Sequence, residues 1–141
     1  MIRRFSKENF ISICDQLAKK DKDLRAIIRE HGYPPMWTRP GTFQTLVLTI
    51  LEQQVSLASA YAAFKRLKER VGRVTPEAIL ALSDEDLRVC YFSRQKIEYT
   101  RILARAILAK EISLKKFQYS LDDEIRIQLT RLKGIGDWTV D

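Results

Sequence analysis

Short amphipathic segments, each opened by a residue that can cap a helix, follow one another along almost the whole chain. The first has Ser6 as its cap and carries an apolar stripe at the i, i+3, i+4 and i+7 positions of one helical face, namely Phe10, Ile13, Cys14 and Leu17. No segment shows sustained alternation of apolar and polar residues, and there is no internal repeat. Since a half-buried strand needs that alternation, the sequence predicts an all-α fold.

The later helix starts are marked by capping residues, by proline in a first turn or by the return of an apolar stripe. They are expected near Asp21 or Asp23, Phe43, Ser56, Thr75, Ser83, Ser93 and Asp122. The stretch 33–41 is the one clear loop, because three of its nine residues are proline and proline cannot continue a helix. We expect a single helical domain over residues 1–141.

The segment that follows Ser93 predicts a long helix. Its apolar stripe, which includes Tyr99, is expected to face the core. Lys96, Arg101 and Arg105 lie off that stripe, so we expect all three on the outer surface.

Basic residues outnumber acidic ones by 25 to 18, which gives a net charge of +7 and an isoelectric point near 9.6. A surplus of this size favours a polyanionic partner, most often a nucleic acid. The alternative is a soluble protein that merely carries extra lysines. Charge alone does not separate these two interpretations.

Several kinds of site are excluded or disfavoured by composition. Cys14 and Cys90 are far apart and have apolar neighbours, so we expect buried free thiols and no disulfide. His31 is the only histidine, which excludes a histidine-based zinc site or catalytic triad within these residues. Because neither a membrane-spanning apolar run nor a signal-peptide core is present, we expect an intracellular location, in the cytoplasm and nucleoid or in the nucleus, and no membrane partner.

The stretch from Lys133 to Gly136 reads Lys-Gly-Ile-Gly and lies between two expected helices. Two glycines permit a tight turn that exposes backbone N–H groups at a helix N-terminus, where an anion is favoured. Ile135 can point into the core, and Lys133 adds a positive charge. The stretch therefore suits binding of a nucleic-acid phosphate without reading of sequence. The alternative is an ordinary helix connection in which glycine only ends a helix.

Three stretches together resemble the helix-hairpin-helix superfamily of base-excision DNA glycosylases. They are 132–139 (L-K-G-I-G-D-W-T), 43–56 with its Phe-x-x-Leu and Ile-Leu-Glu-Gln-Gln-Val-Ser, and 92–96 (F-S-R-Q-K). They lie in family order from about Gly41 to the end of the chain. The resemblance implies a helix-hairpin-helix motif from about residue 122 onward, and double-stranded DNA with a flipped damaged base as the partner of a monomer.

The resemblance also implies residue roles. Phosphate binding would fall to Gly134, Ile135 and Gly136, with Lys133 and Thr139 nearby and Lys96 on the DNA backbone. In this superfamily the hairpin carbonyls commonly hold a monovalent cation, so Na⁺ or K⁺ is expected at the backbone of Gly134 and Gly136. No other cofactor is expected, and these residues offer neither an iron–sulfur nor a zinc motif.

Gln53 and Gln54 follow an apolar stripe at the point where a continuing helix would want leucine. Burying an unpaired amide costs about 1–3 kcal/mol, so we expect the helix to end near Glu52 and Ser56 to cap the next one. The intervening Gln-Gln-Val would then form a projecting turn. The resemblance implies that Gln54, in preference to Gln53, fills the gap left by a flipped nucleotide, with Ser56 nearby. The alternative is a buried amide that holds two helices together.

Trp138 stands where the strand-cleaving members of the superfamily carry a Schiff-base lysine. The resemblance therefore points to the 3-methyladenine DNA glycosylase II branch, which hydrolyses the N-glycosidic bond of alkylated bases without cutting the strand. An alkylated base is cationic, and it stacks favourably on an electron-rich ring by about 0.5–2 kcal/mol. The alternative for Trp138 is core packing. Trp37 is a looser candidate for a pocket wall, and we expect it to pack in the core or the loop.

The resemblance places the catalytic aspartate beyond Asp141, after the second helix of the hairpin. Asp141 matches a different family position, so no catalytic residue is expected in this chain, and the 141 residues are expected to be inactive by themselves. Two alternatives remain open: a non-catalytic helix-hairpin-helix module that binds DNA, and a helical protein-interaction domain.

Overall fold

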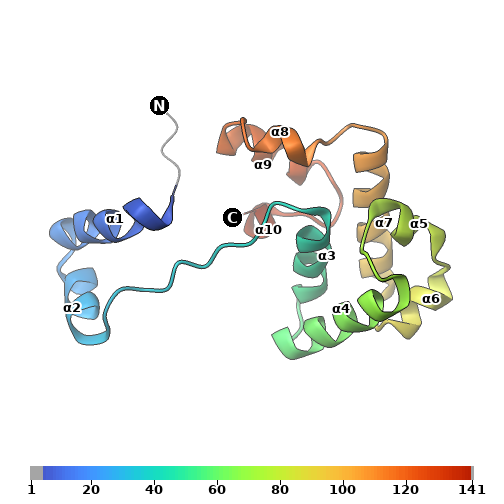
Figure 1. The fold of residues 1–141 in the computed structure, drawn as a ribbon, viewed down its shortest axis with the longest axis horizontal. Helices are drawn as coiled ribbons and strands as arrows, with labels where there is room; N and C mark the ends of the chain where they lie inside the picture. Colours follow the sequence, from blue (N-terminus) through green and yellow to red (C-terminus); the bar gives the residue numbers. More distant parts are fainter. Residues whose placement is uncertain (1–4, 141) are drawn as a thin grey trace. The chain divides into compact units, whose positions relative to one another are not determined.

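A computed structural model describes residues 5–140 and shows an all-helical chain (Figure 1). The helices are α1 Lys7–Lys20, α2 Lys22–His31, α3 Phe43–Glu52, α4 Leu57–Val71, α5 Pro76–Ala81, α6 Asp84–Val89, α7 Arg94–Leu108, α8 Leu114–Phe117, α9 Asp122–Thr130 and α10 Asp137–Val140. No strand occurs within residues 5–140, so the predicted fold class is confirmed.

The chain divides into two compact units at the boundary between Arg39 and Pro40. This boundary lies in the proline-rich loop that the sequence predicted. The expectation of one domain over residues 1–141 stays a prediction.

The first unit contains α1 and α2. Ser6 caps α1 in a capping box with Asn9, and the Asp21 carboxylate caps α2 by accepting two backbone N–H groups. Arg25 Nε donates to the Ala18 carbonyl at 2.9 Å and joins the second helix to the first. The prediction that Trp37 packs in a core or loop is wrong, because 89% of its surface is exposed.

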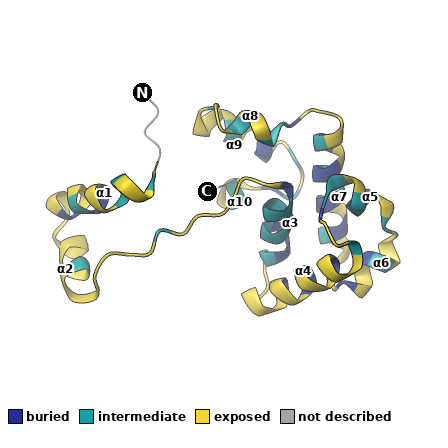
Figure 2. Cartoon of the chain, in the orientation of Figure 1, coloured by how far each residue is buried: buried dark blue, intermediate teal, exposed yellow. Residues whose placement is uncertain are grey.

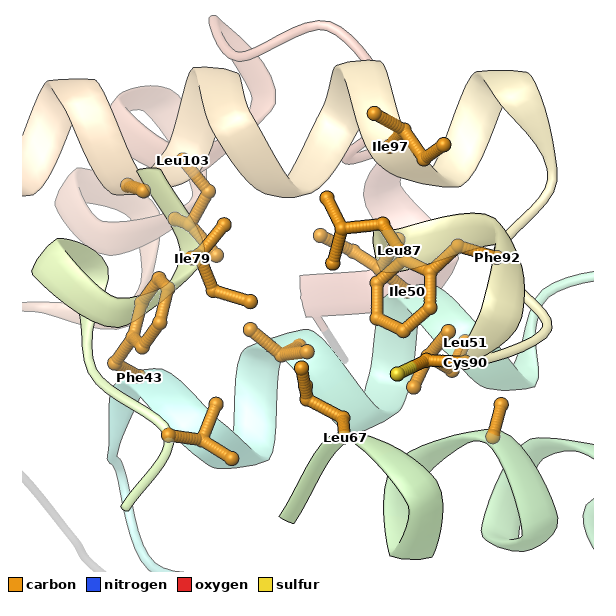
Figure 3. Close-up of a cluster of buried hydrophobic side chains, with 14 of the residues drawn as sticks. Phe43, Ile50, Leu51, Leu67, Ile79, Leu87, Cys90, Phe92, Ile97 and Leu103 are labelled. Carbon is orange, nitrogen blue, oxygen red and sulfur yellow. The ribbon is translucent and has the colours of Figure 1, made fainter. Parts of the chain in front are cut away.

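The core of the second unit lies between α3, α4, α5, α6 and α7 (Figures 2 and 3). Its most deeply buried side chains are Val47, Ile50, Leu51, Leu67, Ile79, Leu87, Cys90, Thr100 and Leu103. Four of them, Val47, Ile50, Leu67 and Leu103, belong to apolar stripes at helical spacing in the sequence. The expectation of free, buried thiols at Cys14 and Cys90 is confirmed.

Helix starts in the second unit follow the predicted caps. The Ser56, Thr75, Ser83 and Ser93 hydroxyls each accept the backbone N–H three residues later. One helix was not predicted: α8 has only four residues, too few to show a helical period, and its preceding residue Ser113 makes no side-chain cap bond.

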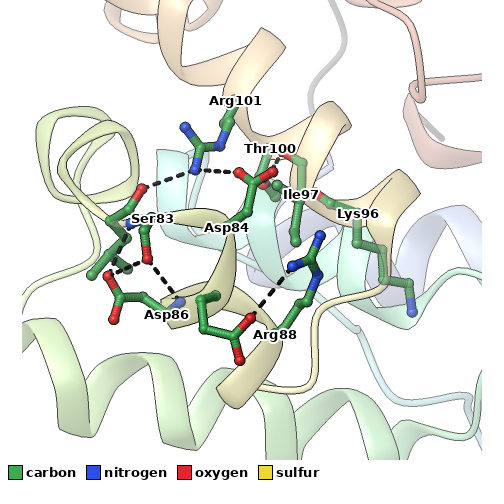
Figure 4. A network of polar contacts seen from close by, with 10 residues as sticks. Ser83, Asp84, Asp86, Arg88, Lys96, Ile97, Thr100 and Arg101 are labelled. Carbon is green, nitrogen blue, oxygen red and sulfur yellow. Dashed lines mark hydrogen bonds and ion pairs between the residues drawn. The ribbon is translucent and has the colours of Figure 1, made fainter.

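Polar contacts tie the start of α6 to the middle of α7 (Figure 4). Arg101 donates to the Leu82 carbonyl at 2.9 Å and to the Asp84 carboxylate at 2.8 Å, and its side chain is only 19% exposed. Lys96 is also half-buried. The prediction that both face outward is wrong, because each finds carbonyl acceptors beside the apolar stripe; Arg105 is exposed as predicted.

No helix within residues 5–140 is long and apolar enough to cross a membrane. In the same residues, no group of three or more His, Cys, Asp or Glu side chains is placed to hold a metal ion.

The capping box of α6 gives a pH-dependent prediction. The Asp86 carboxylate accepts the Ser83 backbone N–H at 2.9 Å and its hydroxyl at 2.8 Å, and it pairs with Arg70. These bonds, with the backbone one largest, hold the pKa of Asp86 below its ordinary value of 3.8. A lowered carboxyl pKa contributes stability that is present above the unfolded-state pKa and is lost as the pH falls through the folded-state pKa.

We therefore expect Asp86→Asn to lower the free energy of unfolding at about pH 7, and the deficit to shrink toward about pH 2. Urea unfolding of both proteins at several pH values across this range measures the deficit. Glu85→Gln is the matched control, because Glu85 makes only an exposed ion pair with Arg88 at 3.4 Å. A deficit that stays constant down to the acid limit would contradict the prediction.

Candidate nucleic-acid interface

The glycine hairpin, residues 131–136, connects α9 to α10. Gly134 has a φ of +93°, a conformation that side-chain-bearing residues rarely adopt. A Cβ at Gly134 would lie 2.1 Å from Cγ of the Tyr99 ring, whereas a Cβ at Gly136 would meet nothing within 4 Å. Glycine is therefore required at position 134 by both backbone and packing, and position 136 is open.

The core anchors the hairpin through Ile135, which is only 4% exposed. Its N–H donates to the Leu132 carbonyl at 3.1 Å, and the Thr139 N–H donates to the Gly136 carbonyl at 3.0 Å. Within residues 5–140, the backbone N–H groups of Gly134 and Gly136 have no acceptor. Ile135 points inward as expected, and two N–H groups remain available to an anion.

Two basic side chains at the hairpin, Lys133 and Arg126, have acidic partners. Lys133 Nζ lies 2.7 Å from Glu98 Oε1, and this hydrogen bond raises the pKa of the lysine. Arg126 pairs with Asp137 at 3.2 Å. Both pairs are partly exposed, so solvent screens them and a phosphate can compete for the cations.

The 53–55 turn, Gln53 to Val55, projects between α3 and α4. As the sequence predicted, α3 ends at Glu52 and Ser56 caps α4, its hydroxyl accepting the Ser59 N–H at 3.2 Å. Gln54 is exposed and has a φ of +56°, which turns the backbone sharply. Its amide is thus presented to solvent at the tip of the turn.

The Gln53 amide points back toward the glycine hairpin. Its Nε2 donates to the Gly134 carbonyl at 2.8 Å and to Thr139 Oγ1 at 3.2 Å. The alternative of a buried amide that holds two helices together fits Gln53 only in part, because its amide is half-buried and joins the turn to the hairpin and α10, whereas Gln54 is exposed. A DNA contact by Gln53 stays a prediction, as do the contacts of Ser56 and Thr139.

Lys96 lies at the start of α7, and its Nζ donates to the Leu51 carbonyl in the last turn of α3 at 2.6 Å. Burial lowers the pKa of this ammonium group. An ammonium carries three hydrogens, so two donors remain after the bond to Leu51. The DNA contact expected of Lys96 stays a prediction.

These segments meet at one polar cleft of about 600 Å³. Its walls include Gln53, Gln54, Lys96, Tyr99, Gly134 and Gly136. The structure thus brings together five residues that the sequence selected from three separate stretches. It adds Tyr99, which the sequence assigned only to the core. The Tyr99 ring also leaves no room for a side chain at position 134. No local sequence pattern predicts this contact, because the two residues are 35 positions apart.

The expected cation would bind to the backbone carbonyls of Gly134 and Gly136. The Gly134 carbonyl accepts from Gln53 and the Gly136 carbonyl accepts from Thr139, so each has one lone pair left. Two such oxygens do not by themselves assemble a cation site. Na⁺ or K⁺ at these residues stays a prediction, and no chemical step is assigned to it.

Trp138 lies on α10 with 92% of its surface exposed. The alternative of core packing for Trp138 is therefore wrong within the described residues. The ring is free to stack on a ligand, and that role stays a prediction. Asp141 lies outside the described residues.

Comparison with known proteins places the chain in a family. Residues 47–139 match the family described as the HhH-GPD superfamily base excision DNA repair protein. The YfjP protein of Bacillus subtilis (strain 168), provisionally named a DNA-3-methyladenine glycosylase, is 31% identical over 98% of this chain and 50% of its own length. An endonuclease III of Sulfolobus acidocaldarius is 32% identical over 72% of this chain and 45% of its own length.

A solved structure is similar as well. It is the Schizosaccharomyces pombe 3-methyladenine DNA glycosylase Mag1 in complex with abasic DNA, with a TM-score of 0.79 and 28% identity over 90% of this chain and 65% of that chain. The chain spans about half the length of the curated relatives it matches. With two thirds of its residues inside the family match, the chain belongs to the HhH-GPD superfamily of base-excision DNA repair proteins.

Proposed function

We propose that this chain forms the DNA-holding part of a base-excision DNA glycosylase that hydrolyses the N-glycosidic bond of alkylated bases such as 3-methyladenine. The observation that carries the proposal is the cleft in which the glycine hairpin faces the 53–55 turn. A phosphate-binding element and an exposed amide at a projecting tip are what a protein needs to hold a duplex around an extruded nucleotide.

The glycine hairpin holds a phosphate in this proposal. The N–H groups of Gly134 and Gly136 have no acceptor within residues 5–140, so they can donate hydrogen bonds to a phosphate. Neither glycine has a side chain that would obstruct that phosphate. Such contacts carry no sequence information, which suits a repair protein that meets damage in any sequence. The net charge of +7 attracts DNA over a longer range.

Gln54 enters the duplex. Its side chain has two donors and one acceptor, so it can bond to the base left unpaired when the damaged nucleotide leaves the stack. Its exposure at the tip of the 53–55 turn supports this role over a structural one.

The damaged base stacks on Trp138. A base alkylated at a ring nitrogen carries positive charge, which an exposed indole ring attracts and which already makes the base a good leaving group. Trp138 in place of a Schiff-base lysine supports hydrolysis without strand cleavage. The names of the Bacillus and Schizosaccharomyces relatives support the substrate class, whereas the Sulfolobus relative is named an endonuclease, so strand cleavage needs its own measurement.

The second candidate function is a non-catalytic DNA-binding module. It would use the same glycine hairpin and the same 53–55 turn to hold DNA, without hydrolysis. By the resemblance, the aspartate that would stabilise the oxocarbenium-like transition state and orient water is expected beyond Asp141. Base release by the full-length protein separates the two candidates.

Substitution of the hairpin glycines tests the phosphate site. Gly134→Ala is expected to lower the free energy of unfolding by about 1–3 kcal/mol, because the new Cβ is strained and meets the Tyr99 ring. Gly136→Ala is expected to change stability by less than about 0.5 kcal/mol. Both are expected to weaken duplex binding by about tenfold or more. The methyl group of Gly136→Ala would obstruct the phosphate, and the strained turn of Gly134→Ala would misdirect the hairpin N–H groups.

Urea unfolding and duplex titrations over a range of salt concentrations measure these effects. Gly41→Ala is the matched control, because its Cβ also meets nothing within 4 Å and Gly41 lies outside the cleft. Normal, salt-dependent DNA binding by both hairpin variants would rule out the phosphate site.

Base release tests the activity. A glycosylase that contains this chain is expected to release 3-methyladenine from methylated DNA, and Trp138→Ala to slow release by about twofold to thirtyfold through loss of stacking. Tyr119→Ala is the control, because Tyr119 is also an exposed aromatic residue. No covalent protein–DNA adduct is expected on borohydride treatment; an adduct would exclude the strand-preserving mechanism, and absence of base release would favour the non-catalytic module.

A further inference from the structure

Gln53 links two segments that lie 81 residues apart in sequence, and the proposed roles of the cleft do not account for this link. Both Nε2 bonds end on the glycine hairpin and α10, at the Gly134 carbonyl and the Thr139 hydroxyl. An amide nitrogen has two hydrogens, so these acceptors use its full donor capacity. The Gln53 nitrogen therefore has no hydrogen left for a nucleic acid.

The two ends of this link are held firmly by other contacts. On the α3 side, the Gln53 N–H donates to the Ile50 carbonyl at 3.3 Å, and the Lys96 ammonium binds the Leu51 carbonyl. On the hairpin side, the Tyr99 ring packs directly against Gly134. The Gln53 amide bonds these two ends directly to each other, and so constrains the distance and orientation between them.

We infer that Gln53 is a positioning residue, whose amide holds the 53–55 turn and the glycine hairpin at the spacing between a duplex gap and a backbone phosphate. This inference rests on the proposed function for the roles of Gln54 and the hairpin. Gln53 acts through these neighbours, and its own nitrogen bonds to protein. Without the amide, the distance between Gln54 and the bound phosphate is no longer fixed. Affinity for a duplex with a gap therefore falls more than affinity for an intact duplex.

The link itself can be tested without DNA. Gln53→Met keeps the length of the side chain and removes both donors, and Thr139→Val removes one acceptor. Nuclear magnetic resonance of the chain is expected to show slowly exchanging Gln53 side-chain protons in the unsubstituted protein. Each substitution is expected to shift the backbone amide signals of residues 134–139. Fast exchange together with unchanged hairpin signals would overturn the link.

The positioning role is tested with two duplexes, one intact and one carrying a tetrahydrofuran abasic site. The quantity measured is the ratio of the two dissociation constants, for the unsubstituted protein, Gln53→Met, Gln54→Ala and the double variant. Each single substitution is expected to reduce the preference for the abasic duplex by about tenfold. The double variant is expected to lose no more than the worse single variant, because Gln53 acts through Gln54.

Other outcomes overturn the inference. A merely structural role of Gln53 lowers affinity for both duplexes equally and leaves the ratio unchanged. If Gln53 contacts DNA directly, the effects of the two substitutions on the ratio of dissociation constants multiply in the double variant. If the unsubstituted protein binds neither duplex, the proposed function fails, while the magnetic resonance result still decides whether Gln53 joins the two segments. If Gln53→Met does not fold, Thr139→Val carries the same comparisons with half of the link removed.

Discussion

Burial of α3 is the constraint on which the second unit depends. Val47 and Ile50 are completely buried on it, with Leu51 nearly so, and α4 and α7 pack against this helix. An apolar helix in that position cannot continue into Gln53 and Gln54 without burying amides. The helix therefore ends where its stripe becomes polar, and the chain turns outward beside the glycine hairpin.

The polar end of α3 is satisfied by residues from distant segments, and these contacts build the cleft. The Lys96 ammonium donates a hydrogen bond to the Leu51 carbonyl, and the Gln53 amide donates one to the Gly134 carbonyl. Carbonyls at a helix C-terminus or in a turn need such donors when they are partly buried. The same bonds that satisfy the backbone also fix the walls of the cleft relative to the core.

The sequence predicted what local chemistry determines. Helices begin after Ser56, Thr75, Ser83 and Ser93 because the side-chain oxygen of each accepts the backbone N–H three residues later. This spacing can be read directly from the sequence. The partners of Gln53 and Lys96 could not be predicted, because they lie 45 to 86 residues away and depend on how the helices pack. For the same reason the outward placement of Lys96 and Arg101 was wrong: a helical period locates a side chain around the axis, and its long stem can still reach an inner carbonyl.

The charges near the hairpin decide how it can hold a phosphate. Lys133 is paired with Glu98, Arg126 with Asp137, and Lys96 with a carbonyl, so each of these cations already has a partner. In the proposed function, the surplus of +7 then acts mainly as a diffuse field that draws DNA to the surface. The precise contact falls to backbone N–H groups, whose strength depends steeply on direction. A site of that kind depends on geometry more than on charge, and its geometry relative to the 53–55 turn is set by the Gln53 amide.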